Sequence, residues 1–251
     1  MNIRSVRAKH DSLFEQLATS EGSSLAPSRI AGQFYCEKKV DLTREHGDIE
    51  TPAKTRGSKT HEKAAEDSEE VSDEEFWNAL ETGDRQVIVE SPFVGEAADF
   101  LIGGIPDAVL FESQKPQLIF ERKTTSRPDH LYKNQSIQAW LYGFILDSLG
   151  FETDDLKIAI LSHEQSLAPE TGKELQQSVI ASYNKWEFGD QKLTESPKSV
   201  LHLSEFSKVE YLEDLNWALG YWRDEREPIP TKKAGKCRAC EYNNVCPDSR
   251  A

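Results

Sequence analysis

Two carboxylates and an ammonium group close short apolar segments of the chain. Asp107 follows Gly-Gly-Ile-Pro, and Glu121 and Lys123 come directly after the apolar run 117–120. On an extended strand, residues two apart leave the same face, so Glu121 and Lys123 point together while Arg122 points to the opposite face. Charges at the end of a buried strand are costly unless they are used. These residues are therefore candidates for a site.

Two carboxylates that converge across a hairpin can bind a hard divalent cation through oxygen, and a neighbouring lysine can orient or deprotonate a water or stabilise a charged phosphate. Taken alone, Asp107 is typical of a turn residue, and Glu121 with Lys123 is typical of an ion pair on a protein surface. Gln138 and Tyr142 are four residues apart on a predicted helix and share one of its faces. His61, on an earlier predicted helix, becomes a metal-ligand candidate only in their company.

The four cysteines have a spacing that favours metal ligation. Cys237, Cys240 and Cys246 form C-x2-C-x5-C, and Cys36 is the fourth. Ligand type alone fits zinc and an iron–sulfur cluster equally. The chain begins without the apolar core and cleavage site of a secretory signal, so we expect a reducing, cytoplasmic compartment, where disulfides are disfavoured.

Composition limits the fold and the partners. The 251 residues allow one α/β domain with a small appended module. A charged fraction of 29% and a mean hydropathy of -0.63 predict no membrane span. The net charge of -14 excludes a protein that coats nucleic acid through bulk positive charge, so any such contact must be local or bridged by metal.

Apolar periodicity predicts the elements of the first half. We expect a helix over 28–42 with Ser28 as its N-cap and Cys36 on it or at its end, and a second helix over 58–66. The acidic run 66–75 is interpreted as a solvated loop or the start of the next helix. Between 86 and 125, three apolar runs separated by Gly and Pro predict a three-stranded meander.

The second half predicts a buried helix over 130–150 that ends at Gly150, then a strand over 156–164, a further strand near 199–206 and an amphipathic helix over 209–225. A helix followed by a strand indicates a crossover and therefore a mixed sheet. The tail from residue 227 has no pattern of its own, so it needs an external staple to be ordered.

Taken in order, the motifs GSKTHE, GIPD, ERK and QAWLY resemble the RecB-like branch of the PD-(D/E)XK nuclease superfamily. The resemblance implies a restriction-endonuclease-like α/β core, a mixed sheet flanked by helices, that hydrolyses DNA phosphodiesters. It also implies roles for the site residues: His61, Asp107, Glu121 and the backbone carbonyl of Arg122 as ligands of Mg²⁺ or Mn²⁺, Lys123 as catalytic, and Gln138 and Tyr142 as serving the active site or the DNA.

The segments FYCEKK and KCRACEYNNVC resemble the CRISPR-associated exonuclease family, Cas type four, over nearly the whole chain. That resemblance implies a [4Fe-4S] cluster held by Cys36, Cys237, Cys240 and Cys246. It implies one nuclease domain over 1–251, with 27–45 and 227–251 as the cluster module and 55–165 holding the core motifs. The implied activity is an exonuclease on DNA ends or single strands, which trims fragments for spacer acquisition with the CRISPR integrase as partner.

Three alternatives remain at this point. A RecB-like nuclease of DNA repair or of a virus carries the same motifs, and a non-catalytic iron–sulfur adaptor that binds DNA keeps the fold without turnover. A zinc-ribbon binding protein differs in colour, because zinc protein is colourless and cluster protein is brown. The acidic chain also departs from the expectation of DNA binding, so either the acidic face points away from the cleft or a partner supplies much of the DNA contact.

Overall fold

The computed structural model describes residues 2–19, 24–51, 72–83, 87–164, 166, 169–188, 191–196 and 198–251. His61, the helix expected over 58–66 and the first part of the acidic run lie outside these residues. In chain order the elements are α1 (Ile3–Thr19), β1 (Ser24–Leu25), α2 (Pro27–His46), α4 (Asp73–Thr82), β2 (Val87–Val89), β3 (Phe93–Ala97), β4 (Phe100–Gly104), β5 (Ala108–Glu112), β6 (Lys115–Thr124), α5 (Lys133–Leu149), β7 (Lys157–His163), α6 (Pro169–Ser182), the 3-10 turn η1 (Tyr183–Lys185), β8 (Gln191–Ser196), β9 (Ser199–Glu205), α7 (Leu212–Trp222) and α8 (Ala234–Arg238).

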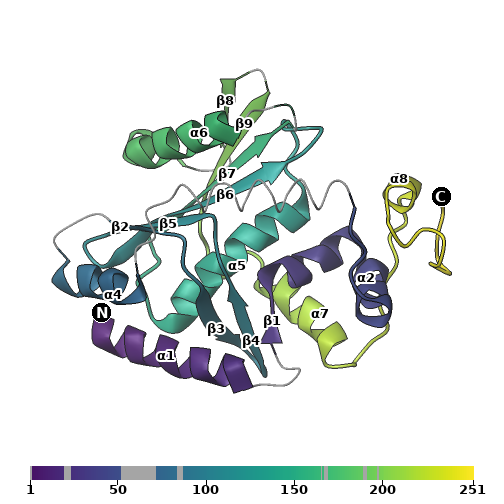
Figure 1. The fold of residues 1–251 in the computed structure, drawn as a ribbon, viewed down its shortest axis with the longest axis horizontal. Helices are drawn as coiled ribbons and strands as arrows, with labels where there is room; N and C mark the ends of the chain where they lie inside the picture. Colours follow the sequence, from purple (N-terminus) through teal and green to yellow (C-terminus); the bar gives the residue numbers. More distant parts are fainter. Residues whose placement is uncertain are drawn as a thin grey trace.

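A mixed six-stranded sheet in the order β2-β5-β6-β7-β9-β8 forms the centre (Figure 1). Strands β6 and β7 are parallel, joined by the crossover helix α5, and the other pairs are antiparallel. Alternate residues of the strands supply two apolar clusters, one packed with α5 and the other with α6. The expected α/β fold, with a mixed sheet flanked by helices, is confirmed.

The predicted three-stranded meander is wrong, because this stretch forms five strands in two sheets. Strands β3 and β4 pair with each other and, through β4, with β1 in a separate three-stranded sheet. The chain breaks at Pro92, after β2, and at Pro106, between β4 and β5, since proline cannot donate to a ladder. Gly95 lets β3 lie against α5, because a Cβ there would come within 3.0 Å of the Cα of Ile145.

The helices largely follow their predictions. α2 begins at Pro27 with Ala26 as its N-cap, so the expected cap at Ser28 is wrong: proline at the first position already fixes the turn. α4 begins with a capping box between Ser72 and Glu75, so the last acids of the acidic run open a helix. α5 ends as expected at Gly150, which has a left-handed φ of 98°.

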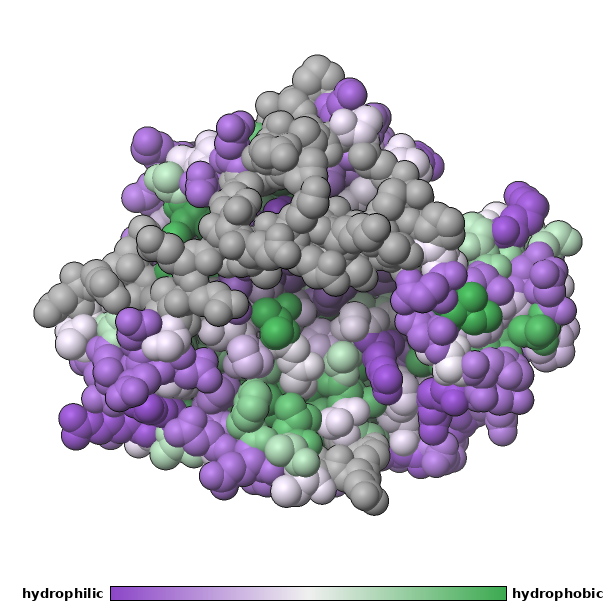
Figure 2. Space-filling model, viewed as in Figure 1, coloured by the Kyte–Doolittle hydropathy of each residue, from purple (hydrophilic) through white to green (hydrophobic). Residues whose placement is uncertain are grey.

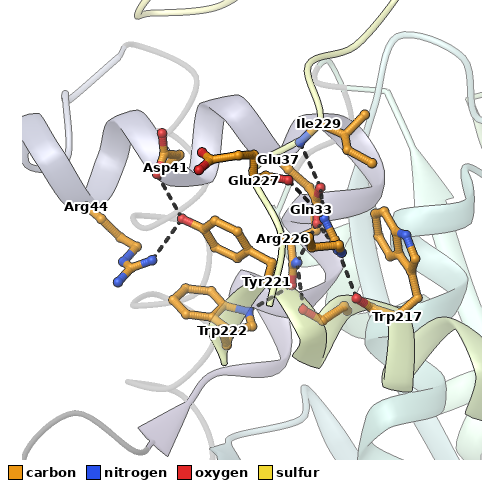
Figure 3. A network of polar contacts seen from close by, with 11 residues as sticks. Gln33, Glu37, Asp41, Arg44, Trp217, Tyr221, Trp222, Arg226, Glu227 and Ile229 are labelled. Atoms are coloured by element: carbon orange, nitrogen blue, oxygen red, sulfur yellow. Dashed lines mark hydrogen bonds and ion pairs between the residues drawn. The ribbon is translucent and has the colours of Figure 1, made fainter. Parts of the chain in front are cut away.

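A buried polar network ties α2 to α7 and to the segment after it (Figure 3). Glu37 is 1% exposed and accepts hydrogen bonds from Arg226 Nη1 and Nη2 at 2.7 and 2.6 Å. The backbone N–H of Ile229 donates to the same carboxylate at 2.9 Å, and Trp222 Nε1 donates to Gln33 at 2.8 Å. The C-terminal segment is thereby fixed beside α2, where Figure 1 also shows α8.

Hydrophilic residues cover the flanks of the face seen in Figure 2, whereas hydrophobic residues reach the surface over the small sheet. In the described ranges, no helix is both long and apolar enough to cross a membrane.

Candidate active site

The β5–β6 hairpin brings the two predicted carboxylates together. Asp107 lies directly before β5, whose first residue pairs with Phe120, so Asp107 is placed beside Glu121. The backbone N–H of Asp107 donates to Glu121 Oε1 at 3.3 Å, and the backbone N–H of Arg122 donates to Asp107 Oδ2 at 2.6 Å. Main-chain bonds across the hairpin therefore orient both acids.

Lys123 completes a buried cluster with these acids. Its Nζ donates to Glu121 Oε2 at 2.7 Å, and Glu121 is only 2% exposed. The alternation expected from the sequence places both side chains on the face of β6 that also carries Ile119, toward α5.

The charges of this cluster do not balance. Burial raises the pKa of Glu121, and the negative charge of Asp107 adds to the effect against the attraction of Lys123. Burial alone would lower the pKa of Lys123, yet the two carboxylates raise it. Two acids and one base leave excess negative charge in a poorly solvated place. A divalent cation fits this donor set, because carboxylate and carbonyl oxygens are the ligands that Mg²⁺ prefers.

Tyr142 and Gln138 reach the site from α5. The Tyr142 hydroxyl donates to the carbonyl of Ile105 at 2.9 Å, two residues before Asp107. Burial raises the pKa of Tyr142, Glu121 raises it further, and a hydrogen bond from the Gln138 side chain opposes both. The expected shared face is thus observed, and the two residues hold the loop that carries Asp107.

A third side chain that ligates metal is not found near the two acids. His61, the expected third ligand, lies outside the described residues. Among those that the structure does describe, no three His, Cys, Asp or Glu side chains form a group able to hold a metal ion. The described part of the site therefore supplies two carboxylates and main-chain oxygen.

The side chains of Arg122 and His163 were missed as functional candidates, because only the backbone carbonyl of Arg122 was expected to act. The side chain of Arg122 lies on the face of β6 opposite to Glu121, next to His163 at the end of β7. Burial lowers the pKa of His163, and the charge of Arg122 lowers it further. The signal was present in the sequence, since the alternation that pairs Glu121 with Lys123 sends Arg122 to the other buried face.

The four cysteines are free thiols that line one small cavity of about 20 Å³. The backbone N–H of Thr231 donates to Cys36 Sγ at 3.4 Å. Cys36 has φ -169° and ψ 112°, so α2 is kinked there by one extended residue. The structure thus brings both ends of the chain to one place. Among the described residues, no three of these thiols form a group that could hold a metal ion.

Comparison with known proteins agrees with the architecture. The chain matches the PD-(D/E)XK nuclease superfamily over residues 37–247 and belongs to it. Membership implies a nuclease that binds a nucleic-acid substrate. A solved structure described as "Crystal structure of SSO0001" has a TM-score of 0.50 and 11% identity, covering 98% of this chain and 96% of that chain, and shows the fold alone. No curated protein matches the chain.

Proposed function

We propose that this protein is a metal-dependent DNA exonuclease. The observation that carries the proposal is the partly buried cluster of Asp107, Glu121 and Lys123 at the end of the β5–β6 hairpin. Its carboxylates suit Mg²⁺ or Mn²⁺, and membership of a nuclease superfamily supports a phosphodiester as the substrate. The action on DNA ends or single strands, and the trimming of fragments for CRISPR spacer acquisition, rest on the resemblance to Cas type four exonucleases.

In the proposed reaction, water attacks phosphorus in line, one P–O bond forms and the bond to the leaving oxygen breaks. Asp107, Glu121 and the carbonyl of Arg122 would hold the cation, with His61 as a further proposed ligand. When bound, the metal supplies Lewis-acid stabilisation of the charge on the phosphate. Lys123, whose raised pKa keeps it an ammonium, adds positive charge beside the phosphate and positions the water.

Gln138 and Tyr142 are proposed to position the acid rather than to react. Gln138 hydrogen-bonds to Tyr142, whose hydroxyl donates to the carbonyl of Ile105 in the loop before Asp107. Because this loop joins β4 to β5 directly before Asp107, an anchor from α5 restricts where the Asp107 carboxylate lies.

We further propose that Cys36, Cys237, Cys240 and Cys246 hold a [4Fe-4S] cluster. Support comes from their common cavity, which Lys39 and Lys236 also line, and from their free thiols. A cluster gives each thiolate its own iron atom, so it spans a wider cysteine arrangement than a single ion does. Its role here is to order the segments 27–45 and 227–251.

The test is a cleavage assay on end-labelled single- and double-stranded DNA with Mg²⁺, Mn²⁺ or EDTA, using anaerobically purified protein whose visible spectrum is recorded. We expect brown protein and metal-dependent shortening from the ends. Asp107→Asn should lower the rate at least about a hundredfold, while Asp99→Asn, in an exposed turn, should not change it. Full activity of Asp107→Asn would refute the proposed site, and colourless, fully active protein would refute the cluster.

A further inference from the structure

Arg122 is a nearly buried cation for which the described residues supply no counter-charge. It is 9% exposed, and its backbone N–H is used by Asp107. Its guanidinium makes no hydrogen bond or ion pair with any residue in the described part of the chain. In that part of the chain, the buried polar atoms that lack a hydrogen bond do not include the Arg122 guanidinium nitrogens. The tip of the side chain is therefore accessible to a ligand.

A cation in this position costs stability unless something pairs with it. Burying an unpaired charge is unfavourable by several kcal/mol. The adjacent His163 offers no compensation, since burial and Arg122 itself favour its neutral form. The acids Asp107 and Glu121 are engaged with Lys123 on the other side of the strand. Within the described part of the chain the guanidinium therefore has no anionic partner, and its accessible tip can take an anionic ligand.

The place of Arg122 in the fold indicates which anion. Leu118 and Phe120 pack with α6, and Arg122 is the next residue on that face, at the carboxyl end of β6. The residues on either side of it, Glu121 and Lys123, face α5. A strand of nucleic acid whose scissile phosphate lies at Glu121 and that crosses this end of the sheet brings a neighbouring phosphate to Arg122.

The helix α6 adds positive potential at the same end. Just after its last residue, the Tyr183 hydroxyl donates to Glu112 at 2.6 Å, and Glu112 pairs with Lys115 at the start of β6. α6 therefore runs antiparallel to β6, and its amino end points toward the end that carries Arg122 (Figure 1). The positive end of a helix dipole favours an anion there.

We propose that the Arg122 guanidinium binds a phosphate of the substrate strand next to the scissile one, across β6 from the paired acids, and so sets the register of the strand over the site. A planar guanidinium suits this task because it holds phosphate through two parallel N–H bonds. The inference rests on the proposed nuclease function, and its binding test does not require turnover.

The first measurement is fluorescence anisotropy with a labelled single-stranded oligonucleotide in Ca²⁺ buffer, over a series of salt concentrations. Arg122→Met should weaken binding about tenfold and reduce the slope of log K against log salt by about 0.7, the loss of one phosphate contact. Arg4→Met, an exposed arginine of α1, is the matched control for one lost charge and should leave the slope unchanged. An unchanged slope in Arg122→Met overturns the proposal.

The second measurement locates the phosphate. A series of oligonucleotides each carries one neutral methylphosphonate, placed at successive positions. The wild type should bind poorly when the phosphate next to the scissile bond is the neutral one. Arg122→Met should become insensitive to neutralisation at that position and keep the wild-type response at all others. If the lost sensitivity is instead to the presence of a 5′-terminal phosphate, the internal contact is overturned. A wild type that binds DNA with this profile but never cleaves would refute the proposed nuclease and leave the phosphate contact standing.

Stability separates a functional arginine from a structural one. Because no described residue pairs with the Arg122 guanidinium, Arg122→Met should melt at the same temperature as the wild type or higher. A clear drop in melting temperature with an unchanged methylphosphonate profile would show that the guanidinium is structural, and would overturn the proposal.

Discussion

Glu121 is a carboxylate in a place where its own ionisation is unfavourable, because burial and Asp107 both raise its pKa. A divalent cation removes that conflict, so Mg²⁺ should stabilise the folded protein. At a concentration one hundred times the dissociation constant, the gain is about 2.7 kcal/mol. Chemical denaturation with Mg²⁺ against EDTA measures it. Glu121→Gln should lose the gain and the exposed-site control Glu96→Gln should keep it; a wild type indifferent to Mg²⁺ and Mn²⁺ contradicts the prediction.

His163 predicts a pH dependence of stability. Burial lowers its pKa below the usual 6.5, so near that pH the unfolded chain binds a proton that the folded chain does not. The contribution of neutral His163 to the free energy of unfolding is therefore fully present above pH 6.5. It is lost as the pH falls from 6.5 through the lower pKa that His163 has in the folded protein. The free energy of unfolding of His163→Asn should fall less steeply between about pH 7 and pH 5, whereas His46→Asn, on an exposed helix end, should behave as the wild type. Parallel curves for His163→Asn and wild type would exclude this role.

How far single residues could be predicted depends on whether their partners are local in sequence. Glu121 and Lys123 share a face through two-residue spacing, which the sequence alone contains, and the hairpin then brings in Asp107. That no described residue pairs with the Arg122 guanidinium could not be predicted, because it depends on which side chains all the elements packed on that face of β6 place around it. The Glu37–Arg226 pair joins residues 189 positions apart, a pairing that no periodicity encodes.

At the scale of elements, periodic and well-capped segments were predictable. Apolar runs interrupted by glycine, and helices with few apolar residues, were not. α5 and β7 follow from their apolar runs and from Gly150. The five strands between residues 87 and 124 were read as three, because an apolar run with internal glycines looks continuous until the chain has to leave one sheet for another. α1 and α6 were not predicted, since their apolar residues are diluted by polar ones, and the structure stabilises them by packing.

The contact of β3 with α5 depends on the absence of a side chain at Gly95. A Cβ there would lie 2.2 Å from Ser148 Oγ and 3.0 Å from the Cα of Ile145, so backbone must shift. Gly95→Ala should lower the free energy of unfolding by about 1–3 kcal/mol through overpacking. Gly235→Ala, in α8, has open space around its Cβ and should be neutral or slightly stabilising. Urea denaturation of both variants is the measurement, and equal effects would contradict the close approach.

At the scale of the whole molecule, the chain closes on itself twice in one region. The cysteine cavity joins Cys36 to the last turn of the chain, and the carboxylate of the next residue, Glu37, binds Arg226 and Ile229. Loop-closure entropy grows only logarithmically with length, so a contact across about 200 residues costs little more than a short one. The polar network therefore fixes the C-terminal segment beside α2 through contacts that do not involve the thiols.

From these contacts we predict that Glu37 controls both the stability of the protein and the assembly of the cysteine module. Glu37→Gln leaves Arg226 as a buried cation with a neutral partner, so the free energy of unfolding should fall by about 3–5 kcal/mol. Iron and sulfide bound per chain after anaerobic reconstitution should fall as well, because the segment that carries Cys237 is no longer held beside Cys36. Glu45→Gln changes an exposed acid of the same helix and is the matched control. Reconstitution of Glu37→Gln to the wild-type iron content, despite the lost stability, would show that the thiols alone align the two ends.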